Sequence, residues 1–137
     1  MRTLALLLTL LLGTSLAQAQ SEDPTPEFRR IITSQLAALQ NGDADGAWAF
    51  AHSSIRNIFG NPDRFYQMVD QGYRPLIDFT RVTFQEAEQA DQVWVQPVRL
   101  SDLNNDEYLA FYAMQRNGEG EWRIAGVQIY PYQPPSL

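Results

Sequence analysis

The stretch Asp78-Phe79-Thr80-Arg81-Val82-Thr83-Phe84 decides the fold class, because the spacing of the apolar residues changes there. Upstream of it, apolar residues recur every three or four positions, which is typical of amphipathic helices. From it onward they recur every second position, which is typical of strands. The chain therefore divides into a helical first half and a β second half.

Local start and stop signals divide the helical half into four segments. Thr25 is suited to the N-cap of a helix and Pro26 to its first position, and Gly42 suits the left-handed residue that closes it. The remaining segments follow from the same signals: Asp43 caps a second helix that runs through Ala51, residues 54–59 form a third, and Asn61-Pro62 starts a fourth that ends at Gly72.

The β half predicts about four antiparallel strands. The first lies around Val82 and Phe84, and the others are 93–100, 108–115 and 122–130, with Asn117-Gly118 as a strong hairpin turn. Neither half is large enough to bury a core alone, so we expect an α+β domain with N-terminal helices packed on one face of a curved sheet. We expect this domain to cover residues 20–137, with 20–25 as a flexible leader and 131–137 as a proline-containing tail outside the sheet.

The N-terminus has the features of a secretory signal peptide. Arg2 provides a positive start, residues 3–12 are almost wholly apolar, and Ala17-Gln18-Ala19 has the small-x-small form of a cleavage site. The alternative is a retained membrane anchor, but the apolar run is shorter than the roughly 18 residues that span a bilayer. We expect cleavage after Ala19, which leaves 118 of the 137 residues, and a periplasmic or secreted location.

Composition excludes several classes of function. The chain has no cysteine and no lysine, and its single histidine is His52, so thiol chemistry, Schiff bases and multi-histidine metal sites are excluded. The acidic balance of 16 Asp and Glu against 10 Arg argues against nucleic acid as a partner. Asp102, Asn104 and Asp106 have the spacing of half a calcium loop, but Ala113 stands where the loop needs an acid. We expect no metal and no cofactor.

Several motifs carry a resemblance to known proteins. Gly42-Asp43-Ala44-Asp45 and the segment 120–126, together with the order of elements, resemble the nuclear-transport-factor-2-like superfamily, a cone-shaped fold also described as cystatin-like. The segments 51–56 and 59–65, with Gly72-Tyr73, are more closely similar to a family of small exported proteobacterial proteins known as domain of unknown function 4864. The resemblance covers residues 27–130. It implies a fold and an export route, but no activity.

The residues leave few candidates for catalysis. Enzymes of the resembled superfamily place an Asp or a His–Asp pair inside the cone as general base, but no predicted strand centre here holds an acid. Asp78 and Glu107, at strand ends, and His52 remain catalytic candidates, and a pairing of His52 with Asp45 or Asp78 stays open. We prefer a structural role for His52 at the C-terminal end of the second helix, where the helix dipole favours a charged imidazole. We assign Ser53 and Ser54 to helix capping.

Three residues are candidates for ligand binding. Arg99 lies near a strand end among apolar neighbours and needs a carboxylate partner or an anionic ligand. Tyr112 and Gln128 are polar residues that strand alternation places toward the interior. We expect a noncatalytic exported module that binds a small apolar or amphipathic ligand or a protein partner. The alternative is a cavity enzyme of the isomerase, dehydratase or hydrolase type. The superfamily resemblance also implies a homodimer through the sheet face.

Overall fold

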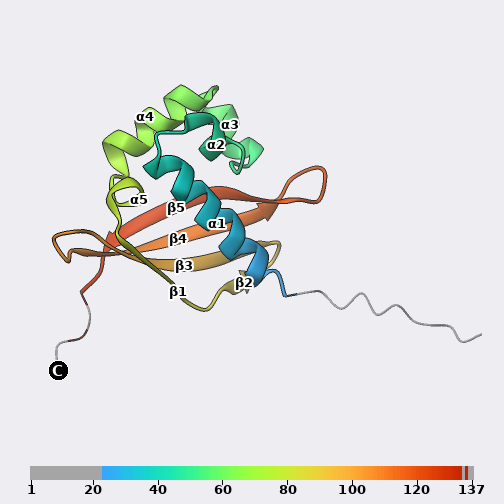
Figure 1. Ribbon diagram of the computed structural model, residues 1–137. Helices are drawn as coiled ribbons and strands as arrows, with labels where there is room; N and C mark the ends of the chain where they lie inside the picture. Colours follow the sequence, from blue (N-terminus) through green and yellow to red (C-terminus); the bar gives the residue numbers. More distant parts are fainter. Residues whose placement is uncertain (1–22, 134, 136–137) are drawn as a thin grey trace, which may run out of the picture.

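The computed structural model describes residues 23–133 and residue 135, and it confirms the expected α+β order. The expected signal peptide and the first residues of the expected leader lie outside the described residues. Figure 1 shows the elements, which are α1 (Thr25–Gln40), α2 (Ala44–Trp48), α3 (Ser53–Phe59), α4 (Pro62–Gly72), α5 (Pro75–Asp78), β1 (Arg81–Phe84), β2 (Glu88–Ala90), β3 (Val93–Ser101), β4 (Glu107–Arg116) and β5 (Trp122–Pro131).

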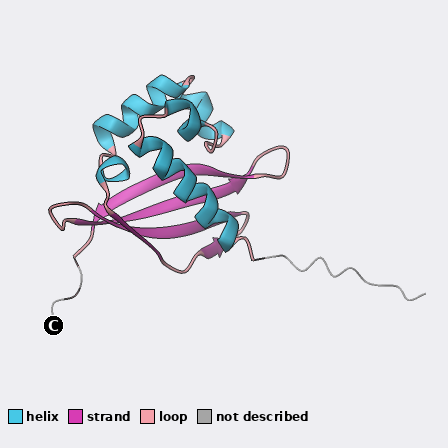
Figure 2. Ribbon diagram, viewed as in Figure 1, coloured by secondary structure: helices cyan, strands magenta, loops and turns pink. Residues whose placement is uncertain are grey.

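The sheet is antiparallel and open, with the strand order β1-β3-β4-β5. β1 pairs with the second half of β3, and the short β2 pairs with its first half, so the sheet has five strands where about four are predicted. The sequence gives no signal for β2, because Glu88, Gln89 and Ala90 are all exposed and show no apolar alternation. The helices lie on one face of the sheet (Figure 2).

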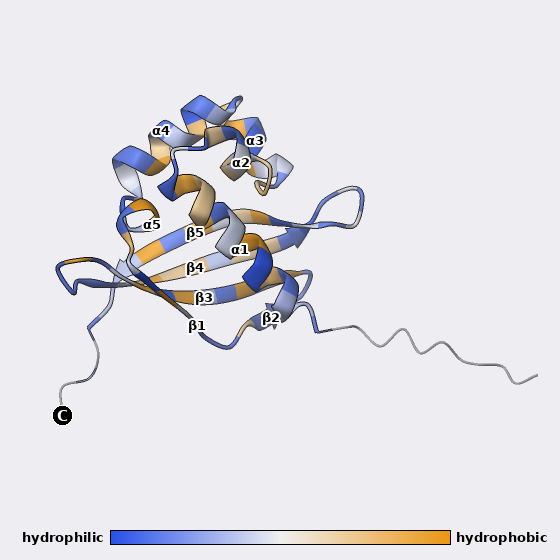
Figure 3. Ribbon diagram, in the orientation of Figure 1, coloured by the Kyte–Doolittle hydropathy of each residue, from blue (hydrophilic) through white to orange (hydrophobic). Residues whose placement is uncertain are grey.

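Helix α1 crosses the sheet and closes the core. The stripe expected from the spacing is buried, and it faces the buried side chains of β3, β4 and β5, whose apolar segments lie beneath α1 in Figure 3. Phe28 contacts two rings edge-on, with centroids 5.7 Å from Trp94 and 4.9 Å from Trp122. The core residues of α1 are Phe28, Ile31, Ile32, Leu36 and Leu39.

The first helix begins differently from the prediction. Thr25 is its first residue and Pro24 its N-cap, because the Pro24 carbonyl accepts the first helical hydrogen bond, from the N–H of Phe28. The Asp23 carboxylate accepts hydrogen bonds from both the backbone N–H and the hydroxyl of Thr25. The expected leader therefore ends at Asp23 and Pro24. The predicted caps of α2 and α4 are confirmed: Asp43 accepts from the N–H of Gly46, and Asn61 accepts from the N–H of Arg64.

The predicted second helix extends too far, and tertiary pairing explains why. It ends at Trp48, because the next residues pair with the edge of the sheet: Ile124 donates to the carbonyl of Phe50, and His52 donates to the carbonyl of Ile124, both at 2.8 Å. His52 is consequently the N-cap of α3, and not the C-terminal end of the second helix. Helix α5, which directly precedes the first strand, is not predicted either.

Phe28 holds α1 to two strands, so its truncation tests the shared core. Replacing it with alanine should lower the free energy of unfolding by about 3–5 kcal/mol, the usual cost of a large buried aromatic residue. Chemical denaturation measures the change. The control is Thr33→Ala, on the exposed side of the same helix, which should change stability by no more than about 0.5 kcal/mol. Equal effects of the two substitutions would contradict a core closed by Phe28.

Candidate functional site

An apolar cavity of about 310 Å³ lies between the helices and the edge of the sheet. Its walls come from α1, α3 and α4, and its floor is the segment 124–127 of β5, above which α3 and α4 lie in Figure 1. Ile58, on α3, is 75% exposed and belongs to the lining. The other side chains from the helical layer are Gln35, Leu39, Ile55, Phe59, Phe65, Met68, Val69, Tyr73 and Leu76.

The floor of the cavity contains an irregularity of the sheet. Met114 of β4 pairs with Ile124 and Ala113 pairs with Gly126, so Ala125 is an extra residue on β5 without a partner on β4. Such a bulge bends the strand that carries it. The bulge directly follows Ile124, onto which the Phe50–His52 segment docks.

Gln35 brings an amide into this apolar cavity. The residue is only 2% exposed, and its Nε2 donates to the carbonyl of Ala47 at 3.2 Å. Among the described residues, no donor is bonded to its Oε1, and this oxygen is not one of the fully buried atoms that lack a partner, so it is accessible to solvent. We did not predict Gln35 as a site residue. The signal was present, because it is a polar residue inside the apolar stripe, four positions from both Ile31 and Leu39.

Tyr112 faces the interior, as predicted, but it does not line the cavity. It is fully buried on β4, opposite Gln96 of β3, and its hydroxyl has no hydrogen-bond partner in the described structure. Burial raises the pKa of Tyr112 far above its ordinary value, so the side chain is a neutral phenol. Gln96 donates to the carbonyls of Gln85 and Pro97 while its own Oε1 lacks a partner.

The prediction that Gln128 faces the interior is wrong. It is exposed and pairs with Phe111 on the face of the sheet that the helices leave open. The bulge is the physical reason, because one extra residue inverts the alternation of the strand. Val127 and Ile129 therefore pack toward the core in place of Gln128.

Arg99 has the carboxylate partner that its position requires. Its guanidinium forms an ion pair with Glu107 at 2.6 Å and lies 4.7 Å from the ring centre of Tyr132. Both charged residues belong to the helix-free face, and neither lines the apolar cavity. The ligand candidate and one catalytic candidate thus neutralise each other.

The structure does not bring the three catalytic candidates together. His52 accepts through Nδ1 from the N–H of Ser54 at 3.1 Å, which requires the neutral tautomer whose Nε2–H faces the carbonyl of Arg116 at 3.3 Å. Asp78 forms an exposed ion pair with Arg74. Within residues 23–133, no hydrogen bond joins His52, Asp78 or Glu107 to one another, and none of them lines the cavity.

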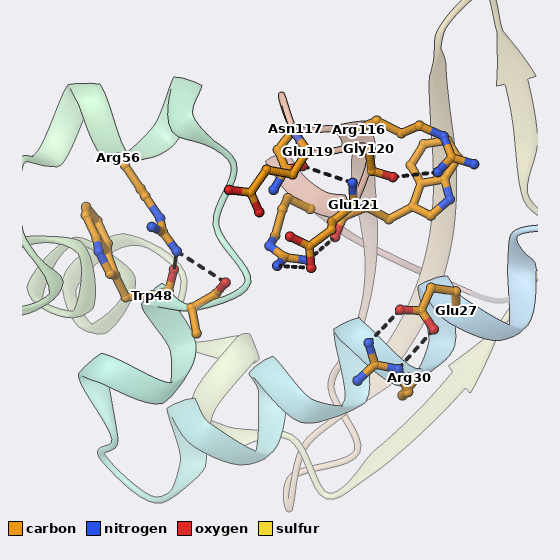
Figure 4. Close-up of polar contacts among 12 residues, drawn as sticks. Glu27, Arg30, Trp48, Arg56, Arg116, Asn117, Glu119, Gly120 and Glu121 are labelled. Carbon is orange, nitrogen blue, oxygen red and sulfur yellow. Dashed lines mark hydrogen bonds and ion pairs between the residues drawn. The ribbon is translucent and has the colours of Figure 1, made fainter.

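Further ion pairs lie on the surface and bear on stability more than on a site. Figure 4 shows Arg30 bonded to Glu27 one turn away on α1, and this bond lowers the pKa of the Glu27 carboxyl. The described residues hold no group of three or more potential metal-ligating His, Asp or Glu side chains. Of the helices in residues 23–133, none is long and apolar enough to cross a membrane.

Comparison with known proteins gives one finding. A family model with the description "Domain of unknown function (DUF4864)" matches residues 21–137. No curated protein and no solved structure matches the chain.

The buried hydroxyl of Tyr112 provides a test of its role. Because an unpartnered buried hydroxyl costs about 1–3 kcal/mol, Tyr112→Phe should raise the free energy of unfolding by about 1 kcal/mol. The control is Tyr66→Phe, which removes the bond from the Tyr66 hydroxyl to the carbonyl of Leu39 and should lower stability. Thermal or urea denaturation measures both. Destabilisation by Tyr112→Phe would show instead that the hydroxyl has a partner.

Proposed function

Since the chain belongs to the DUF4864 family, whose description assigns no activity, we propose its function from the geometry: a noncatalytic binding module for a small apolar molecule that carries one hydrogen-bond donor. The observation that carries the proposal is the apolar cavity with the unpartnered Oε1 of Gln35. The apolar walls favour a ligand by removing its surface from water, and the amide oxygen would orient it.

The size of the cavity limits the ligand. A volume of about 310 Å³ lies at the lower end of the range for small-molecule sites. At about 30 Å³ for each water-sized group, it corresponds to roughly ten non-hydrogen atoms. A bicyclic phenol or a medium-chain alcohol is of this size and supplies the single donor.

The lining also favours binding over the catalytic alternative. Tyr73 is the one side chain in the lining with a titratable group, and no carboxylate or imidazole belongs to it. A general base must lie within hydrogen-bond reach of the proton that it removes. The catalytic candidates have other contacts: His52 caps α3, and Asp78 and Glu107 form ion pairs.

Titration with 1-naphthol and with naphthalene tests the role of Gln35. Both should bind, because both fit the apolar walls, but only 1-naphthol can donate to Oε1. Gln35→Leu should therefore lower the affinity for 1-naphthol about three- to tenfold, which is the range for one hydrogen bond. The affinity for naphthalene should stay the same or rise. Isothermal titration calorimetry gives both affinities. If neither compound binds, the proposed function is wrong. If Gln35→Leu lowers the affinity for both compounds equally, the amide does not have the proposed role.

A charge at the rim provides a second test of the same cavity. Ile58→Glu should lower the affinity for both compounds, since it places a carboxylate in the apolar wall. Because Ile58 is exposed, the fold should tolerate the change. Leu103→Glu is the matched control, because Leu103 is 87% exposed on the β3–β4 loop and lines neither this cavity nor any other described one. Affinities that fall equally in the two variants would contradict a site beside Ile58.

We also propose that the protein is exported, cleaved after Ala19, and dimeric through the helix-free sheet face. Half-buried apolar side chains on that face support the dimer, including Val95, Phe111 and Leu109, and its Arg99 is neutralised by Glu107. Native mass spectrometry of protein from the periplasm should give twice the mass of the 118-residue chain. The Phe111→Glu variant should give the mass of a single 118-residue chain. An uncleaved mass, or a monomer before substitution, would contradict the respective proposal.

A further inference from the structure

A second cavity, chemically unlike the first, lies at the end of the sheet where α1 begins. It is an open cleft of about 1010 Å³, bordered by the β2–β3 turn, the end of β4 and the start of β5. Trp94 and Trp122 form its aromatic part. Its polar part contains three glutamines, two aspartates and Arg116.

The two tryptophans are fixed in place before any ligand arrives. Each is half-buried, and each contacts Phe28 edge-on from a different strand. A ligand that lies against an indole of this cleft therefore loses no binding energy to ordering it.

The polar side chains around the tryptophans keep free hydrogen-bonding capacity. Gln89 donates through Nε2 to the carbonyl of Asp91, and its Oε1 has no donor among the described residues. Asp23 uses Oδ1 for both bonds from Thr25, and these bonds lower the pKa of its carboxyl, so it is ionised and its other oxygen is available. Gln92 is exposed in the turn and has no side-chain bond in the described structure.

Arg116 restricts the charge of a ligand. Its guanidinium lies 4.3 Å from the ring centre of Trp122 and donates to the carbonyl of Gly120 at 2.7 Å (Figure 4). The guanidinium thus covers this indole and repels a cationic ligand, so Trp94 is the indole left for a ligand to lie against. Asp23 and Asp91 repel an anionic ligand. The ligand that remains is neutral, rich in hydrogen-bonding groups, and flat enough to lie on an aromatic ring.

We propose that this cleft binds a neutral saccharide chain. A pyranose ring presents C–H groups on its faces, which pack on indoles, and hydroxyls on its rim, which both donate and accept. Amides such as Gln89 and Gln92 offer a donor and an acceptor side by side, and the carboxylates accept from hydroxyls. The proposal does not depend on the apolar cavity, since the two share no lining residue.

Titration of the full chain with cellotetraose, maltotetraose and N-acetylchitotetraose tests the proposal. At least one should bind and change the tryptophan fluorescence, with Trp94 and Trp122 at the site. Gln92→Ala should lower the affinity for that saccharide about three- to tenfold. Gln67→Ala, an exposed glutamine on α4 away from the cleft, should not. Ile58→Glu should also leave saccharide binding unchanged, which separates this proposal from the apolar site.

Two outcomes would overturn the saccharide site. One is that none of the three tetrasaccharides binds at millimolar concentration. The other is that Gln92→Ala and Gln67→Ala change the affinity equally. Both residues are exposed, so circular dichroism of either variant should match that of the unchanged chain.

Discussion

The packing of Phe28 against Trp94 and Trp122 is the interaction on which the rest of the structure depends. Neither the helices nor the sheet can bury a core alone, so α1 must lie across the strands with its whole apolar stripe inward. Phe28 fixes one end of α1 to β3 and β5. The same contacts orient the two indoles, so that one aromatic cluster serves the core on one side and lines the open cleft on the other.

Two residues from Trp122 on β5, the backbone of Ile124 sets the position of the smaller helices. Its two hydrogen bonds to the Phe50–His52 segment end α2 and start α3, and the bulge at Ala125 follows immediately on the same strand. This contact adds to the one that α1 makes with β5 through Phe28 and Trp122. The floor of the apolar cavity is the segment 124–127, which contains the bulge.

Local chemistry made most of the fold predictable from the sequence. Asp43 and Asn61 cap their helices through bonds to residues nearby in the sequence. The predicted alternation around Val82 and Phe84 is present in β1. The errors share a different cause, which is pairing between distant segments. His52 caps α3 and does not end the second helix, because its backbone bonds to Ile124. Gln128 lies on the helix-free face because the bulge inverts the alternation of β5. The exposed β2 forms only because β3 offers it an edge.

The candidate sites were less predictable than the fold, because burial and pairing decide them. Arg99 was identified because a partly buried charge needs a partner, and Glu107 supplies it from the adjacent strand. Gln35 carries the signal of a polar residue within an apolar stripe, but sequence alone cannot distinguish a core amide satisfied by the backbone from one that faces a cavity. Gln35 is partly both, since Nε2 is satisfied and Oε1 is not.

The two cavities differ in chemistry but border the same helix. Asp23 precedes α1 at the open cleft, and Gln35 lies on α1 at the apolar cavity, which is about 18 Å farther along at 1.5 Å per residue. On β5, by contrast, the two linings come within two residues of each other, at Trp122 and Ile124. The two proposed sites therefore meet on β5 while they stand apart on α1, and they share no lining residue.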